Sequence, residues 1–348
     1  MTGGGKARSK RGAITAPEAG PAISVLMPVR NGAAYLDAAL ASLAAQSFAD
    51  FEIVVVDNGS SDGTAAILAE WQEREPRLRV ARFERPRLAA TLNLAASLAR
   101  GPLLARLDAD DLARPGRLAR QFRVFRAHPE LQLLGSAAVL IDPRGRWCGK
   151  LRPPLTRNGI RERQRISSGL IPSSTMMRAA AFDAVGGYRE GLNVSEDYDL
   201  WTRIAERFVV ANLPDVLIDY RIHDDSITAR QPVRMALASL CVSAAAKARL
   251  TGAEEPFIRG VPALRLALPL LGMSRAAARR VVRLRSIVNL LSRRWRMLPL
   301  PGFVKVLPLR LARGLGLQSL YTHWLEARHG LRKRRRGVSP GRTRTARP

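Results

Sequence analysis

The sequence predicts an α/β domain with a mostly parallel sheet flanked by helices, followed by a helical, strongly basic C-terminal extension. Between residues 23 and 107, short apolar runs alternate three times with segments whose apolar residues recur at helical spacing. The loops between them are short, as in strand–helix–strand units. From about residue 232 onward, Ala, Leu and Arg dominate a pattern that is typical of helices.

In the first half, each apolar run predicts a buried parallel strand, and each segment between two runs predicts a helix. Ser61 or Asp62 is expected to cap the second of these helices. The expected strands cover residues 23–27, 51–57, 78–83 and 103–107, and the expected helices cover 34–45, 64–74 and 91–100.

The second half is less regular. Gly186 and Gly187 are expected to stop one helix, and Ser195 is expected to be the N-cap of the next. A turn is expected at residues 142–145. The remaining expected elements are strands at 131–141, 173–178 and 213–221, and helices at 178–185 and 196–207.

Charge is distributed unevenly along the 348 residues. The chain has 57 Lys and Arg against 29 Asp and Glu, a net charge of +28. Residues 274–348 contain twenty basic residues and one acid, whereas residues 23–273 contain 27 of the acids. This division predicts a catalytic or binding domain with a cationic appendage, which suits nucleic acid, an anionic membrane surface or a phosphorylated substrate.

Composition excludes several classes of protein. With 47% hydrophobic and 25% charged residues, the chain is not wholly disordered, collagen-like or coiled-coil. Its two cysteines cannot form a disulfide framework, which favours a cytoplasmic protein. We expect no secretory signal and no transmembrane helix. The expected divisions are a flexible basic arm at 1–21, a main domain at 22–230, a helical region at 231–330 and a disordered basic tail at 331–348.

Polar residues follow three of the expected strands where each one ends. They are Pro28–Asn31, Asp57 with Asn58, and the acidic cluster Asp108, Asp110 and Asp111. In open parallel sheets, ligands bind at the carboxyl ends of the strands, so this edge is the predicted site. The loops contain neither a dinucleotide fingerprint nor a phosphate-binding P-loop.

Asp108 and Asp110 are separated by one residue. In extended geometry both carboxylates would point to the same side and could share Mg²⁺ or Mn²⁺. The alternative is an acidic cap on the helix that follows. Asp57 has two interpretations as well, since it could accept hydrogen bonds from a nucleotide or form an Asx turn.

Three further residues are candidates in the second half. Glu196 and Asp197 begin an expected helix, where a sheltered carboxylate suits a general base and also suits a cap on the helix dipole. His223 lies just beyond a strand end, where a phosphate or metal role competes with a structural one.

Seven segments, in order along the chain, resemble an inverting glycosyltransferase of family 2 with the GT-A fold. They cover about residues 22–228 and include a D-x-D motif. The segments are ISVLMPVRNGAAYLDAALASLAAQSF, FEIVVVDNGSSDGT, LAATLNLAASLARGPLLARLDADD, RPGRLARQ, VGGYRE, SEDYDLWTRIAE and YRIHDDSIT. The resemblance implies transfer of a hexosyl or N-acetylhexosaminyl group from a nucleotide-diphosphate sugar, a UDP-sugar above all.

The same resemblance implies a role for each matching position. Asp197 would be the base that deprotonates the acceptor hydroxyl, with Glu196 as its neighbour and second candidate. Asp110, Asp108 and His223 would hold Mg²⁺ or Mn²⁺ at the diphosphate. The residues implied at the nucleotide are Pro28, Val29, Arg30, Asp57, Arg87, Asn93 and Asp108.

The acceptor is expected to be a sugar, a lipid-linked sugar or a protein, in the synthesis of a cell-surface polysaccharide, glycolipid or glycoprotein. Ile171 precedes Pro172 where relatives have a His-Pro pair, and residues 232–348 lie outside the resemblance. The basic residues among apolar ones at 297–325, with RKRRR at 332–336, favour a helical subdomain that packs on the core and makes peripheral contact with the inner face of the cell membrane. Binding of nucleic acid through its phosphates is the other interpretation of this segment. Two alternatives remain: a nucleic-acid-binding protein with a nucleotide-fold core, and a sugar-phosphate nucleotidyltransferase.

Overall fold

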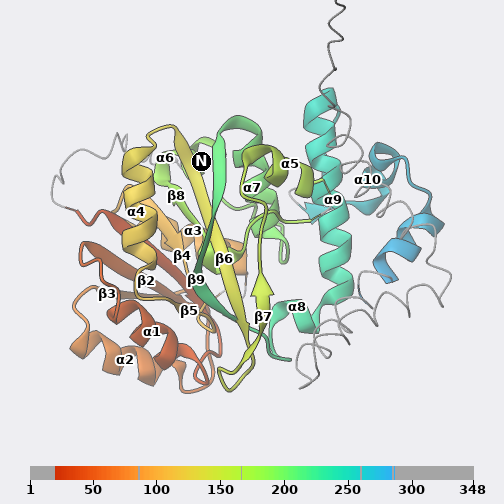
Figure 1. Cartoon of the computed structure of the whole chain (residues 1–348). Coiled ribbons are helices and arrows are strands. Elements are labelled where there is room, and N and C mark those ends of the chain that lie inside the picture. The colour runs from red at the N-terminus through yellow and green to blue at the C-terminus, as the bar shows by residue number, and fades with distance from the viewer. Residues whose placement is uncertain (1–19, 85–86, 166, 259–260, 284–285, 287–348) are drawn as a thin grey trace, which may run out of the picture. The chain divides into compact units, whose positions relative to one another are not determined.

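Four parallel strands from the first half of the chain form one end of a mixed sheet (Figure 1). The computed structural model describes residues 20–84, 87–165, 167–258, 261–283 and 286. The strands of this sheet are β1 (Ile23–Val29), β2 (Phe51–Asp57), β3 (Leu78–Arg82), β4 (Leu103–Arg106), β5 (Leu112–Ala113), β6 (Leu131–Ile141), β7 (Trp147–Leu151), β8 (Met176–Arg178) and β9 (Val209–Arg221).

The strand order is β3-β2-β1-β4-β8-β6-β9-β5, with β7 paired to β6. β1 lies parallel between β2 and β4, and β8 joins β4 to β6 through antiparallel pairs. The long strands β6 and β9 run parallel to each other. The polar ends of β1, β2 and β4 therefore lie at one edge of the sheet, as the sequence predicts.

Helices cover both faces of the sheet because the central strands are apolar on both sides. Val25 and Met27 pack with α1, α2 and α4, whereas Leu26 and Val54 pack with α3, α6 and α7. The helices are α1 (Leu36–Ala44), α2 (Thr64–Arg74), α3 (Leu88–Leu98), α4 (Arg117–Ala127), α5 (Arg157–Arg163), α6 (Ala179–Ala184), α7 (Glu196–Arg207), α8 (Ile227–Arg230), α9 (Pro232–Thr251) and α10 (Leu264–Leu271).

The first strand is longer than expected, since it continues through Pro28 to Val29. Its neighbour β4 ends at Arg106, opposite Leu26, so Pro28 has a strand partner only on the β2 side. A proline is tolerated there because one side of the strand no longer needs a backbone N–H donor.

Two other expectations need correction. Residues 173–178 do not form one strand, because a short 3-10 turn at Pro172–Ser174 precedes β8. Ser195 precedes α7 in the left-handed region, with φ 61°, and its side chain makes no capping hydrogen bond. N-caps use extended backbone, so the Ser195 hydroxyl cannot reach the first turn, where Glu196, Asp197 and Asp199 instead complement the helix dipole.

Beyond residue 230 the described chain is largely helical, as expected. Pro232 occupies the first turn of α9, and Gly252, with φ 68°, ends the helix in the left-handed conformation. A small hairpin of β10 (Phe257–Ile258) and β11 (Val261–Pro262) separates α9 from α10. The apolar and basic segment 297–325, the arm before residue 20 and the tail at 331–348 lie outside the described residues.

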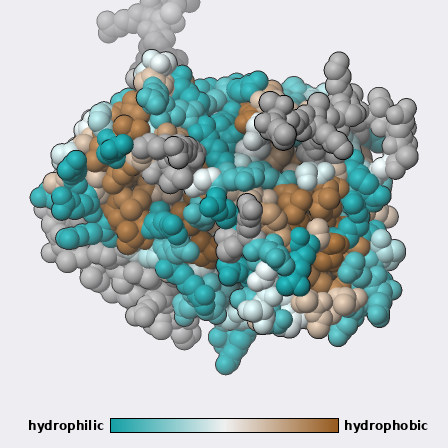
Figure 2. Space-filling view, turned by 180° about the vertical axis from the view of Figure 1, so that it is seen from behind, coloured by the Kyte–Doolittle hydropathy of each residue, from teal (hydrophilic) through white to brown (hydrophobic). Residues whose placement is uncertain are grey.

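Among the described residues, no helix is both long and apolar enough to cross a membrane. Apolar side chains nevertheless reach the surface, and Figure 2 shows them in separate patches divided by polar residues. The large exposed ones include Trp147, Val233 and Leu250.

Candidate functional site

The loops that follow β1 and β2 are joined by hydrogen bonds. The Asp57 carboxylate, which is buried, accepts from the backbone N–H of Ser60 at 3.0 Å. Ser60 Oγ accepts from the Asn31 N–H at 2.9 Å, and Asn31 Oδ1 accepts from the Ser61 N–H at 2.8 Å. Asn31 has a φ of 52°, a conformation that Asn tolerates better than most residues. Asp57 thus makes the expected turn, and its role toward a nucleotide stays a prediction.

Four neighbouring candidates differ in exposure. Pro28 and Val29 are buried at the end of β1, whereas Arg30 is exposed beside them. Asn58, which follows Asp57, is buried, and its Oδ1 has no hydrogen-bond partner in the described part of the chain. A buried acceptor of this kind needs a partner, such as a ligand or an ordered water.

Asp108 and Asp110 point to different partners. Residues 108–111 form a turn, closed by a 3.1 Å bond from the Asp111 N–H to the Asp108 carbonyl, rather than an extended strand. The extended geometry expected for Asp108 and Asp110 is therefore wrong, and a metal shared by the two carboxylates stays a prediction. Asp108 turns toward Arg106, and Asp110 turns toward His223.

Asp110 and His223 form the pair at which a metal ion would fit. Asp110 Oδ2 lies 2.8 Å from His223 Nε2, and the imidazole packs against the Tyr35 ring at a centroid distance of 5.0 Å. Nowhere in the described ranges do three or more His, Cys, Asp or Glu side chains gather as a metal-binding group. Mg²⁺ and Mn²⁺ accept such a small protein donor set when substrate phosphates and waters complete the coordination.

Asp111 links the turn to two distant segments. Its buried carboxylate accepts from Ser173 Oγ at 2.5 Å and from the Arg221 N–H at 2.7 Å. Ser173 Oγ in turn accepts from the Asp108 N–H at 3.1 Å. Burial raises the pKa of Asp111 well above its ordinary value, and the like charges of Asp110 and Asp108 add to this shift. Asp111 therefore fixes the turn from within and does not face the ligand edge.

Arg106 connects this turn to the acids on α7. Its buried guanidinium lies 2.8 Å from Asp108 Oδ1 and 3.3 Å from Glu196 Oε1. Burial alone would lower the pKa of Arg106, but Asp108, Tyr188 and Glu196 raise it well above its ordinary value. One permanent positive charge is therefore shared by the carboxylates of two segments that are far apart in the sequence.

Glu196 and Asp197 have different surroundings. Glu196 is buried in the ion pair with Arg106, whereas Asp197 is partly exposed and accepts from the Tyr198 N–H at 2.6 Å. Burial raises the pKa of Glu196 to about 7, with Asp197 adding to the shift and Arg106 opposing it. Burial also raises the pKa of Asp197, and Arg106 again opposes the shift. Of the two acids, Asp197 is the more accessible to an acceptor.

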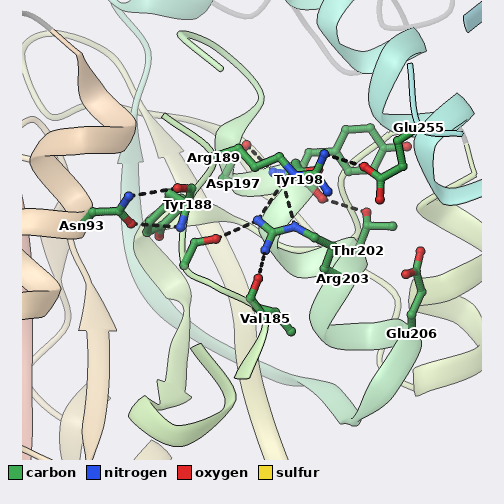
Figure 3. Close-up of polar contacts among 12 residues, drawn as sticks. Asn93, Val185, Tyr188, Arg189, Asp197, Tyr198, Thr202, Arg203, Glu206 and Glu255 are labelled. Carbon is green, nitrogen blue, oxygen red and sulfur yellow. Dashed lines mark hydrogen bonds and ion pairs between the residues drawn. The ribbon is translucent and has the colours of Figure 1, made fainter. Parts of the chain in front are cut away.

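Two residues implied at the nucleotide lie on α3. Arg87 is exposed at the N-cap position of this helix. Asn93 bonds the backbone of Tyr188 twice, by donating to its carbonyl and accepting from its N–H, each at 2.9 Å (Figure 3). Gly187 allows this approach, because its φ is 66° and a Cβ there would lie 2.9 Å from Asn93 Oδ1. The structure thus gives Asn93 a structural bond, and a nucleotide role stays a prediction.

Sequence reasoning missed the residues that hold the candidates in place. From the sequence, Arg106 is placed only within the expected strand 103–107 and Asp111 only within an acidic cluster. Ser173 and Arg221 lie about 60 and 110 residues from Asp111. The one local signal was the run of acids after a buried strand, because Asp favours turns.

The chain is similar to known proteins over most of the described residues. The family model described as glycosyl transferase family 2 matches residues 24–186. The chain is 30% identical over 208 residues to the O-antigen biosynthesis glycosyltransferase WbnJ of Escherichia coli, a match that covers 59% of this chain and 81% of WbnJ.

Solved structures share the fold. S. aureus TarS 1-349 in complex with UDP-GlcNAc has a TM-score of 0.55 and 19% identity, over 78% of this chain and 72% of that one. The mannosyltransferase PcManGT from Pyrobaculum calidifontis, in complex with GDP-Man and Mn²⁺, has a TM-score of 0.53 and 20% identity, over 90% and 86% of the two chains. At these identities, the likeness concerns the fold.

Proposed function

The chain belongs to glycosyl transferase family 2, and from this membership and the site we propose that it transfers a sugar with inversion, using Asp197 as the base. It is a nucleotide-sugar glycosyltransferase with a GT-A fold. Membership of this family disfavours the two alternative functions, nucleic-acid binding and sugar-phosphate nucleotidyl transfer. The observation that carries the proposal is the arrangement around Arg106, which links the donor-side Asp108 to the acid pair on α7.

The donor would bind at the ends of β1 and β2. The segment Pro28–Arg30 and the buried Asp57 border this edge, and Asn58 Oδ1 has no hydrogen-bond partner among the residues that the structure describes. Because the Asn31–Ser60 and Asn31–Ser61 bonds hold the two loops together, the nucleotide pocket is organised before the donor arrives.

Asp110 and His223 would hold Mg²⁺ or Mn²⁺ at the diphosphate. Such an ion, when bound, supplies Lewis-acid stabilisation of the negative charge on the departing nucleotide diphosphate. Asp111 and Arg221 hold the turn that carries Asp110, and the Tyr35 ring limits the orientation of His223.

Asp197 would take the proton from the attacking acceptor hydroxyl. An oxygen nucleophile displaces the nucleotide diphosphate from the anomeric carbon in one step, so the configuration at that carbon inverts and no covalent sugar–enzyme intermediate is needed. Glu196 would remain in its ion pair with Arg106 and keep this positive charge beside the base. A carboxylate with a raised pKa is a stronger base than an ordinary aspartate.

We expect this protein to bind a nucleoside diphosphate, UDP or GDP, tightly only when Mg²⁺ or Mn²⁺ is present. Asp110→Asn should weaken the Mn²⁺-dependent affinity by at least about tenfold, because it removes a carboxylate ligand while keeping the shape of the side chain. Thermal shift and titration calorimetry with and without Mn²⁺ measure this effect.

Asp219→Asn is the matched control, since Asp219 lies on β9 and pairs with Arg114 at the surface. Its affinity should equal that of the wild type. If Asp110→Asn binds as well as the wild type, or if a chelator leaves wild-type affinity unchanged, Asp110 is not a ligand.

The relatives indicate the donor sugar and the acceptor only as chemical classes. UDP-GlcNAc and GDP-Man are the donors bound to two structural neighbours, so a hexosyl or N-acetylhexosaminyl donor fits this chain. WbnJ carries O-antigen biosynthesis in its name, which supports an acceptor in cell-surface polysaccharide synthesis. Competition between UDP and GDP for the same site would select the nucleotide.

The basic C-terminus is proposed to bind an anionic membrane surface, where a lipid-linked acceptor would lie. Residues 331–348 contain eight basic residues in eighteen, each of which contributes about 1 kcal/mol near such a surface. Deleting them should reduce sedimentation with phosphatidylserine-containing vesicles and leave donor hydrolysis nearly unchanged. Vesicles of phosphatidylcholine alone are the control, and unchanged sedimentation after the deletion means that the tail is not an anchor.

A further inference from the structure

Helix α9 holds the first turn of α7, which carries the acid pair, and both helices lie beyond the residues that the family model matches. Ser243 Oγ on α9 lies 3.0 Å from Tyr198 Oη on α7. Ser239 Oγ, one turn earlier on α9, lies 3.4 Å from the hydroxyl of Ser195. The phenol of Tyr198 also donates to the Gln164 carbonyl, at the end of α5.

Tyr198 connects these contacts to the proposed base. Its backbone N–H donates to Asp197 Oδ1 at 2.6 Å, so Tyr198 contributes to the orientation of the Asp197 carboxylate. Tyr198 is buried, and its ring packs with Leu192, Val194 and Val242 in an apolar cluster between α9 and the segment that leads into α7. A shift of α9 is therefore transmitted to Asp197 through one residue.

A second set of contacts reaches the same helix from residue 255. Arg189 lies 2.5 Å from Glu255 (Figure 3). It also lies 3.4 Å from Asp199 on α7, and its guanidinium stacks on the Phe257 ring at 4.6 Å. Arg249 on α9 pairs with Glu255 at 3.0 Å and with Glu206, near the end of α7, at 2.7 Å. Both ends of α7 are thus tied to the segment from α9 to Phe257.

We propose that α9 and the Glu255 segment position the catalytic acid, with Tyr198 and Ser243 as positioning residues, so that the catalytic unit of this chain extends at least to residue 257. The inference rests on the proposed function, because it takes Asp197 as the base. Neither positioning residue touches the reacting atoms; both act through the hydrogen bond from the Tyr198 N–H to Asp197.

The effect of losing this support should fall on turnover. Proton abstraction depends on the distance and angle between the base and the hydroxyl, and a displacement of about 1 Å can reduce the rate about 10²-fold. Donor binding depends on the loops after β1, β2 and β4, which α9 does not hold through any of the contacts described above. Loss of the α9 contacts should therefore lower kcat without changing donor affinity.

The test uses the full chain with Tyr198→Phe, Ser243→Ala and the double variant. We expect Tyr198→Phe to lower kcat about 10- to 10²-fold, while the donor KM and nucleotide Kd stay within about twofold. Ser243→Ala should change kcat in the same direction, and the double variant should be no slower than Tyr198→Phe, because both changes remove the same contact.

Thr251→Ala is the matched control, since within the described part of the chain the Thr251 hydroxyl bonds only carbonyls of α9 itself. It should keep wild-type kcat. A lower melting temperature with unchanged kcat in Ser243→Ala and Tyr198→Phe, or additive losses in the double variant, would overturn the inference. If Tyr198→Phe does not fold, Ser243→Ala and its kcat still decide the question.

The inference and the proposed function fail in different ways. Normal kcat in the α9 variants, together with loss of transfer in Asp197→Asn, rejects the positioning role and leaves the proposed base intact. Normal transfer in Asp197→Asn rejects the proposed base itself and, with it, the inference.

Discussion

Replacing Asp197 with asparagine should lower sugar transfer by about 10²–10⁴-fold, the usual contribution of a general base. The change keeps the size of the side chain and removes its basicity. Nucleotide affinity should stay within about threefold, because the donor-side loops do not contain Asp197. Initial rates of transfer with saturating donor, together with calorimetric nucleotide binding, measure the two effects separately.

The pH dependence gives an independent check on the same residue. A base must be deprotonated to act, so kcat/KM should fall as the pH drops through the pKa of Asp197, which burial raises above its ordinary value. Glu196→Gln is the control variant. If it is the more damaging change, the roles of the two acids are reversed; if both variants transfer normally, the pair only caps α7. Asp199, the next acid on α7, is a poor candidate for the base, because Arg203 pairs with its buried carboxylate at 2.7 Å.

Arg106→Gln should reduce the free energy of unfolding by about 3–5 kcal/mol, the usual cost of removing one partner of a buried ion pair. Glu196 would lose the positive charge 3.3 Å from its carboxylate and would have to remain buried without it. Urea denaturation followed by circular dichroism measures the loss. This change should be among the most destabilising single substitutions at the site.

The double variant Arg106→Gln with Glu196→Gln separates charge from packing. Because it removes both charges of the buried pair, it should recover part of the stability lost in Arg106→Gln. If Arg106→Gln lowers the free energy of unfolding by less than about 1 kcal/mol, this pair stabilises the fold no more than a surface ion pair does.

The sequence predicted the parallel half of the sheet well, because strands buried on both faces appear as short continuous apolar runs. β2 and α2 have the expected bounds, and the polar strand ends lie at one edge. The predictions were less accurate for segments with weaker periodicity. Pro172 imposes a 3-10 turn before β8, and the left-handed Ser195 cannot serve as an ordinary N-cap.

The identity of the site was easier to predict than its internal contacts. Positions at the ends of expected elements, together with the family resemblance, brought out Asp110, His223 and the acid pair, and the structure places Asp110 beside His223. The separation of Asp108 from Asp110 depends on Arg106 and Asp111, whose partners lie in segments remote in the sequence. Local pattern contains no information on such pairs, since it describes periodicity over a few turns or strands.

These long-range pairs also determine when, during translation, the site can be completed. The residues up to 107 supply β1 to β4, and the pairing of these four strands with one another needs no residue synthesised later. The Arg106–Glu196 pair and the Asp111–Arg221 bond must wait for residues about 90 and 110 positions later. The strands of the proposed nucleotide edge are therefore synthesised long before the acid that would complete the site, and a nascent chain remains without its proposed base until residue 197 has left the ribosome.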